Sequence, residues 1–148
     1  MKIVAGKSLL HSKHCSALLQ SGKVLNVSIN SSRTKFDKAI LPCAHSEMAC
    51  LHRWWCQNRG TKEKKRRRLL KKMTLIIVRV MASGEFGNSM PCKDCLDLIK
   101  DLGIKRVVYS NQEGKLVEKK TLDMIADHES GGYSQVGEFC RSVAFCKH

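Results

Sequence analysis

The sequence predicts one α/β domain of three layers, built around a single mixed sheet of about five strands. Its strand-like and helix-like segments follow one another in the order strand, strand, helix, strand, helix, strand, strand. The strongly apolar and β-branched run 73–80 is typical of a central strand. The last two expected strands are separated by only the four residues 111–114, too few for a crossover helix, so they should be antiparallel neighbours.

The first half of the chain predicts a hairpin followed by a helix. Two apolar runs, 15–20 and 23–30, are joined by Ser21 and Gly22, which favour a tight turn. A helix is expected from about residue 44, because Met48, Leu51 and Trp55 are spaced to form one apolar stripe. Trp54 and Trp55 are adjacent on this helix, so we expect at most one of them to face the core.

The second half predicts a strand, a loop, a helix and two further strands. The loop 83–90 follows the central strand and leads into a helix that Pro91 is well placed to start. Leu98, Ile99 and Leu102 give this helix an apolar face, and Gly103 should end it. The strands 104–110 and 115–118 complete the sheet.

Length and composition favour a single intracellular domain. The 148 residues suffice for one core, and residues 1–148 contain no evident domain boundary. We find no signal-peptide core and no apolar stretch long enough to span a membrane, so we expect a cytoplasmic or nuclear protein that is not secreted and has no membrane partner. Eight cysteines without a secretion signal argue against a disulfide framework.

The net charge of +14 is concentrated in one segment. Residues 59–72 contain nine Lys or Arg and the single acid Glu63, which amounts to +8. So dense a cluster attracts polyanions, and RNA or single-stranded DNA is the partner it suggests, with Arg66, Arg67 and Arg68 as the candidate contacts. A nuclear-import signal and a solvated loop are the alternatives.

Two short motifs contain the residues of a catalytic zinc site. His45-Ser46-Glu47 and Pro91-Cys92-x-x-Cys95 supply one imidazole and two thiolates, the three protein ligands that leave a fourth position for water. Glu47 is too hard a ligand to be preferred where thiolates are available, and we interpret it as a proton shuttle. We therefore expect one Zn²⁺ per chain, on His45, Cys92 and Cys95, with a structural zinc or a redox cysteine pair as alternatives.

These residues, in this order, resemble the cytidine deaminase-like superfamily over roughly residues 13–118. The signature H-x-E followed by P-C-x-x-C is highly specific and is typical of zinc-dependent nucleobase deaminases. The resemblance implies a three-layer α/β/α fold, a zinc ion on the ligands named above and a catalytic Glu47. It also implies substrate-binding roles for Asn30, which ends the second strand, and for Ser46, which stands where alanine is commonest.

The same resemblance implies a hydrolase that converts cytosine to uracil in a nucleoside or nucleotide and releases ammonia. The hairpin of the last two strands favours a free nucleoside or nucleotide, whereas the basic charge favours the alternative, the same reaction on single-stranded RNA or DNA. A catalytically silent, zinc-containing nucleic-acid-binding module is a third hypothesis. The 44 residues between Glu47 and Cys92 exceed the usual separation, which marks about 59–72 as a basic insertion. Small relatives commonly form homo-oligomers, and residues 120–148 are expected to be a C-terminal extension.

Overall fold

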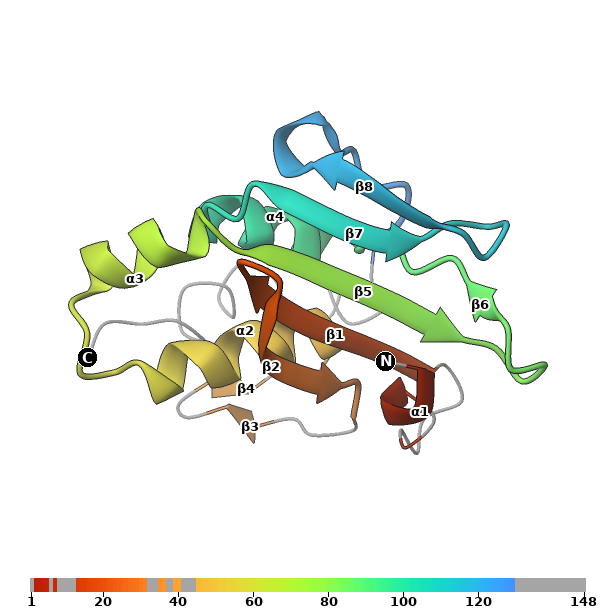
Figure 1. The fold of residues 1–148 in the computed structure, drawn as a ribbon, viewed down its shortest axis with the longest axis horizontal. Coiled ribbons are helices and arrows are strands. Elements are labelled where there is room, and N and C mark those ends of the chain that lie inside the picture. The colour runs from red at the N-terminus through yellow and green to blue at the C-terminus, as the bar shows by residue number, and fades with distance from the viewer. Residues whose placement is uncertain are drawn as a thin grey trace.

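The computed structural model describes residues 2–5, 7, 13–31, 35–36, 39–40 and 45–129, which form a sheet with helices packed against it (Figure 1). The C-terminal extension expected from about residue 120 therefore lies mostly outside the described residues. Among the described residues, no helix has the length and apolar character needed to cross a membrane. The elements, in chain order, are α1 (Lys2–Ala5), β1 (Lys13–Gln20), β2 (Lys23–Ile29), β3 (Lys35–Phe36), β4 (Ala39–Ile40), α2 (Ser46–Gln57), α3 (Glu63–Leu70), β5 (Thr74–Val80), β6 (Phe86–Gly87), α4 (Lys93–Leu102), β7 (Arg106–Ser110), β8 (Leu116–Lys120) and the 3-10 turn η1 (Thr121–Asp123).

The predicted N-terminal hairpin is confirmed. β1 and β2 pair antiparallel, and Gln20 is opposite Lys23 across the turn. Ser21 and Gly22 both have positive φ angles, 50° and 77°. Two consecutive residues of positive φ define the type I′ turn, whose twist matches that of the flanking strands.

The main sheet has the strand order β2-β1-β5-β7-β8, with the short strand β6 paired to β5. The apolar strand β5 is central, as its sequence predicts. β5 and β7 are parallel and are connected through α4, whereas β1 with β5 and β7 with β8 are antiparallel. The sheet is therefore mixed, and β2 and β8 form its two opposite edges.

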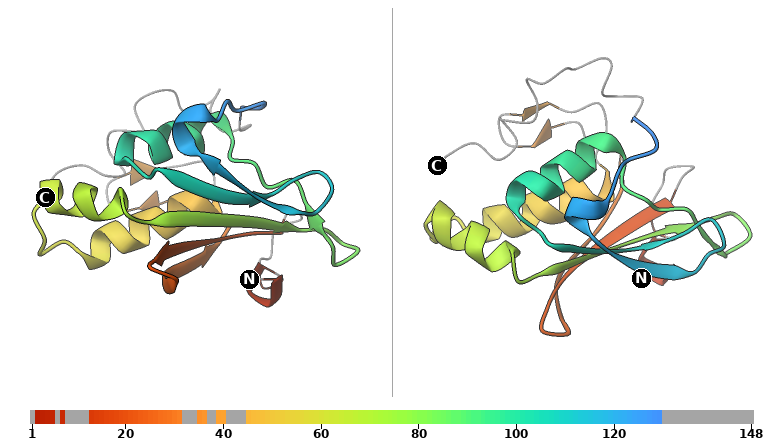
Figure 2. Two further views of the ribbon diagram at one scale, coloured as in Figure 1. Left: turned by 45° about the horizontal axis from the view of Figure 1, so that its top comes forward. Right: turned by 90° about the horizontal axis from the view of Figure 1, so that it is seen from above.

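Helices lie on both faces of the sheet, which confirms the predicted fold class (Figure 2). α2 and α4 cover one face, where Leu75 and Ile77 of β5 belong to the main core. On the opposite face, Ala5 of α1 packs with Cys15 and Val78. Within the described residues, the outer layer on that second face is the single turn of α1, so most of the core lies between the sheet and α2 and α4.

α2 is more deeply buried than its sequence suggests. Trp54 and Trp55 are both 5% exposed, so the expectation that at most one of them faces the core is wrong. Both belong to the main core, and α3 provides the additional cover, because the Arg66 guanidinium stacks 4.0 Å from the ring centroid of Trp55. Neither tryptophan is thus available as an exposed platform for a base.

α4 begins at Lys93, two residues after Pro91, which was expected to start it. Cys92 is its N-cap, in an extended conformation, and Pro91 precedes that cap instead of opening the helix. Gly103 ends the helix as predicted, with a φ of 82°. This left-handed conformation suits glycine at a helix C-terminus.

Candidate metal centre

The structure brings together the three residues predicted to bind zinc. His45, Cys92 and Cys95 offer ligand atoms that all lie within 4.8 Å of one another. His45 and Cys92 are the N-caps of α2 and α4, and Cys95 lies in the first turn of α4. The ligands are therefore held at the N-terminal ends of two helices packed on the same sheet face.

The spacing of these atoms fits a tetrahedral zinc ion. Nδ1 of His45 is 3.4 Å from Sγ of Cys92 and 3.4 Å from Sγ of Cys95. A nitrogen and a sulfur bound to the same tetrahedral Zn²⁺, at about 2.0 and 2.3 Å from it, are about 3.5 Å apart. One imidazole and two sulfurs at these separations can hold the metal and leave one tetrahedral position for water.

Of the two cysteines, Cys92 is poised to carry a negative charge. A hydrogen bond with the Cys95 thiol, helped by the hydrogen bond with His45, lowers the pKa of Cys92 to about 4 despite burial. The pKa of Cys95 is raised correspondingly, because it retains the shared proton and is buried. Helix N-termini favour anions, and metal ligation requires thiolates, so the site can release protons as it binds a cation.

Glu47 is buried beside these ligands and is 4% exposed. Burial raises its pKa, which the charge of His45 and a hydrogen bond from Ser46 partly oppose. A carboxyl group whose pKa is raised toward neutrality can both accept and donate a proton. Its position and protonation behaviour fit the predicted proton shuttle.

Ser46 lies behind Glu47 and has no exposed surface. Its hydroxyl donates to Oε2 of Glu47 at 3.1 Å and is paired with the Ser16 hydroxyl at 2.6 Å. These buried contacts do not favour the expected substrate-binding role of Ser46. They form a chain from β1 to the carboxylate of Glu47.

Asn30 closes β2 at the same end of the sheet and is 8% exposed. Its side-chain oxygen accepts a hydrogen bond of 2.9 Å from the backbone N–H of His14, and its own backbone N–H donates to the carbonyl of His14. This pairing fixes the amide beside the first residues of β1. Its predicted contact with the sugar or base stays a prediction.

Sequence reasoning missed His14 and Ser16 of β1. His14 lies opposite Arg79 of β5, and burial, followed by the charges of Arg79, His45 and His128, lowers the pKa of His14 to about 4. His14 and Ser16 are two residues apart on one strand and therefore share a sheet face, the face on which Ser16 contacts α2. This alternation of polar residues in an apolar strand is the signal that could have identified them.

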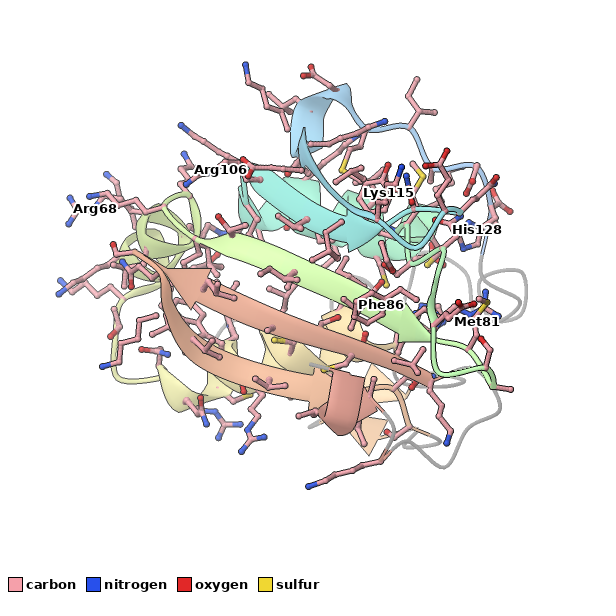
Figure 3. All side chains as sticks on the ribbon, turned by 45° about the vertical axis from the view of Figure 1, so that its right-hand side comes forward. Arg68, Met81, Phe86, Arg106, Lys115 and His128 are labelled. Atoms are coloured by element: carbon pink, nitrogen blue, oxygen red, sulfur yellow. The ribbon has the colours of Figure 1, made fainter. Side chains whose placement is uncertain are left out.

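The three arginines predicted to contact nucleic acid have different surroundings. Arg66 is 4% exposed and donates to the carbonyl of Trp55, so its guanidinium is a core group and not a surface contact. Arg67 donates hydrogen bonds to the Glu63 carboxylate, at 2.9 Å, and to the backbone carbonyl of Asp101, at 2.8 Å. Only Arg68 of the three is exposed, and it projects outward from α3 (Figure 3).

Comparison with known proteins identifies a structural neighbour. No protein-family model matches the chain, and no curated protein matches it in sequence. The structure is similar to the crystal structure of a cytidine deaminase from Burkholderia pseudomallei, with a TM-score of 0.55 and 18% sequence identity. The match covers 86% of this chain and 91% of that one. The chain therefore has a cytidine deaminase-like fold.

Proposed function

We propose that this protein is a zinc-dependent hydrolytic deaminase that converts cytosine to uracil in a nucleoside or nucleotide and releases ammonia. The observation that carries the proposal is the placement of Glu47 next to His45, Cys92 and Cys95, whose ligand atoms are close enough together to hold one metal ion. Those ligands include no carboxylate. Glu47 is thus left for proton transfer.

The reaction needs a nucleophile and a group that moves protons. Zinc held by His45, Cys92 and Cys95 supplies a Lewis acid that makes water nucleophilic near neutral pH. The Glu47 carboxylate accepts one proton of the attacking water and transfers it to the ring nitrogen next to the reacting carbon. It then takes the second proton from the hydroxyl group added to that carbon and passes it to the amine, which leaves as ammonia while the C=O bond forms. Water and cytosine are consumed in equal amounts, and uracil and ammonia are formed.

The structural neighbour supports this reaction class at the level of the fold, because its name describes a cytidine deaminase. The buried position of Glu47 supports it further. A carboxylate that merely capped a helix would be more stable if exposed to water, whereas desolvation favours a group that carries a proton during the reaction.

A second candidate function is the same deamination of cytosine within single-stranded RNA or DNA. It is favoured by the net charge of +14 and by the exposed cations of α3. A panel assay for ammonia release separates the candidates. The zinc-loaded protein is incubated with cytidine, CMP, dCMP, adenosine and a cytosine-bearing oligonucleotide.

We expect turnover of at least one cytosine nucleoside or nucleotide and none of adenosine. Activity confined to the oligonucleotide would assign the second function. No release from any cytosine substrate, by a protein shown to contain one zinc per chain, would leave the silent nucleic-acid-binding module as the remaining interpretation.

A further inference from the structure

We infer that a groove along the outer side of α2 binds the phosphodiester backbone of single-stranded nucleic acid. The groove has a volume of about 780 Å³ and lies between α1, the C-terminal part of β2 and α2. It is distinct from the metal centre. Residues of α2 from Ala49 to Gln57 line it, so it follows the helix for about 12 Å at 1.5 Å per residue.

The charge of the groove is of one sign. Lys7, Arg53 and Arg59 line it, and among the described residues its lining includes no Asp or Glu. Lys7 and Arg53 are exposed and form no ion pair with any described residue. Cations that have no protein carboxylate to neutralise them produce a positive potential that attracts a polyanion.

The rest of the lining suits a nucleic acid strand. Val27 and Ile29 provide apolar surface, and Ser28 and Ser31 provide hydroxyl groups that can bind phosphate or sugar oxygens. A positive groove that follows the backbone is the usual site for a flexible single strand. The described part of the lining contains no Phe, Tyr or Trp, so we expect binding that is strongly salt-dependent and nearly independent of sequence.

The groove lies between the metal centre and the basic helix α3. At one end, Ser31 is next to Asn30, which lies beside His14 near the metal centre. At the other end, Arg59 follows α2 and is three residues from Lys62, the N-cap of the basic helix α3. Figure 1 shows the chain turning after α2, so that α3 runs back toward β5 from the C-terminal end of α2. A strand in the groove could extend from the metal centre to the exposed cations of α3.

Binding is tested by fluorescence anisotropy with labelled oligo(U) and oligo(dT), which contain no cytosine and cannot be deaminated. A failure of the proposed enzyme activity would therefore leave this test unaffected. The groove variant is Lys7→Glu/Arg53→Glu/Arg59→Glu. The matched control is Lys105→Glu/Lys119→Glu/Lys120→Glu, whose residues are exposed and lie on or beside β8, the opposite edge of the sheet.

Each substitution removes one positive charge and adds one negative charge, so both triple variants change the net charge from +14 to +8. We expect the groove variant to bind at least about tenfold more weakly near 0.1 M salt. The slope of log K against log salt should become shallower by about 2, because each lost phosphate contact on a single strand contributes about 0.7. The control variant should lose no more than about threefold.

Equal weakening in both triple variants would show that net charge alone attracts the strand and would overturn the proposal. Loss of binding confined to Lys62→Glu/Lys64→Glu/Lys65→Glu would place the strand on α3 and would also overturn it. Equally tight binding of polyglutamate of matched charge would indicate an acidic protein partner instead. Arg59 also contacts Cys56, at 3.5 Å, so the triple groove variant could be destabilised. If it unfolds, the single variant Arg53→Glu is tested instead, with Lys119→Glu as its control.

Discussion

The Ser46 hydroxyl donates a hydrogen bond of 3.1 Å to Oε2 of Glu47. Because Ser46 is held in turn by Ser16 at 2.6 Å, the carboxylate is linked to the first strand of the sheet through two buried hydroxyl groups. A hydrogen bond to a charged group is worth about 1.5–3 kcal/mol. This link therefore orients the proposed proton shuttle and favours its ionised form.

We predict that Ser46→Ala lowers kcat about tenfold and changes KM little. The reason is that Ser46 contacts Glu47 and has no exposed surface with which to bind substrate. Steady-state kinetics on the best cytosine substrate measure both constants. Ser16→Ala keeps the bond to Glu47 and should cause a smaller loss, whereas an unchanged kcat in Ser46→Ala would remove the positioning role.

Replacing one of the proposed metal ligands should affect both zinc content and stability. Cys92→Ala should lose zinc and lower the thermal midpoint, because a metal held by this cluster would tie the N-termini of α2 and α4 together. Cys56→Ala is the matched control, since Cys56 is a half-buried cysteine of α2 that is not part of the ligand set. Zinc content is measured by elemental analysis of both variants. A Cys92→Ala protein with one zinc per chain would contradict the ligand assignment.

Arg66 and Arg68 should differ in their effect on stability. Arg66→Ala removes the stacking on Trp55 and a buried hydrogen bond, so we expect the free energy of unfolding to fall by about 2–3 kcal/mol. Arg66→Met should restore part of this loss, because Nε of Arg66 is buried without a hydrogen-bond partner. Arg68→Ala should change stability by less than about 0.5 kcal/mol. Urea unfolding of the three variants measures these differences, and equal effects at the two positions would contradict the burial of Arg66.

His14 should make stability depend on pH. Its pKa is about 4 in the folded protein and 6.5 in the unfolded chain, so between these values the unfolded chain binds more protons. The folded state therefore loses stability as the pH falls below about 6.5, by at most roughly 2 kcal/mol from pH 7 to pH 5. His14→Gln should be less sensitive over this interval. Urea unfolding at the two pH values tests the sign, and an identical pH dependence in the variant would exclude His14 as its source.

Much of the fold follows from local patterns in the sequence. The Ser21-Gly22 turn, the strongly apolar β5 and the glycine that ends α4 each act through short-range backbone preferences. The clustering of His45, Cys92 and Cys95, which could hold a metal ion, was predictable for a related reason. Metal ligation needs particular side chains at particular spacings, and both motifs keep them together in the sequence.

The parts that the sequence did not predict depend on contacts between distant segments. Trp55 is covered because Arg66, eleven residues later, folds back over it, and helical periodicity on α2 alone cannot indicate that. The contact of Ser16 with Ser46 joins residues 30 apart in the chain. For the same reason, the run of Arg66, Arg67 and Arg68 looks like one charged patch in the sequence. In the structure Arg66 is buried, Arg67 is hydrogen-bonded to neighbouring residues and Arg68 is exposed.

The most direct test of the central claim is a comparison of cytosine deamination by the wild-type protein and Glu47→Gln at equal zinc content. Conversion of a cytosine nucleoside or nucleotide to the uracil product is followed by ultraviolet absorbance, with ammonia measured in parallel. We predict multiple turnovers by the wild-type protein and a rate at least about a thousandfold lower for Glu47→Gln, which retains one zinc per chain but cannot transfer the proton. Equal turnover by the two zinc-loaded proteins would contradict the proposed mechanism.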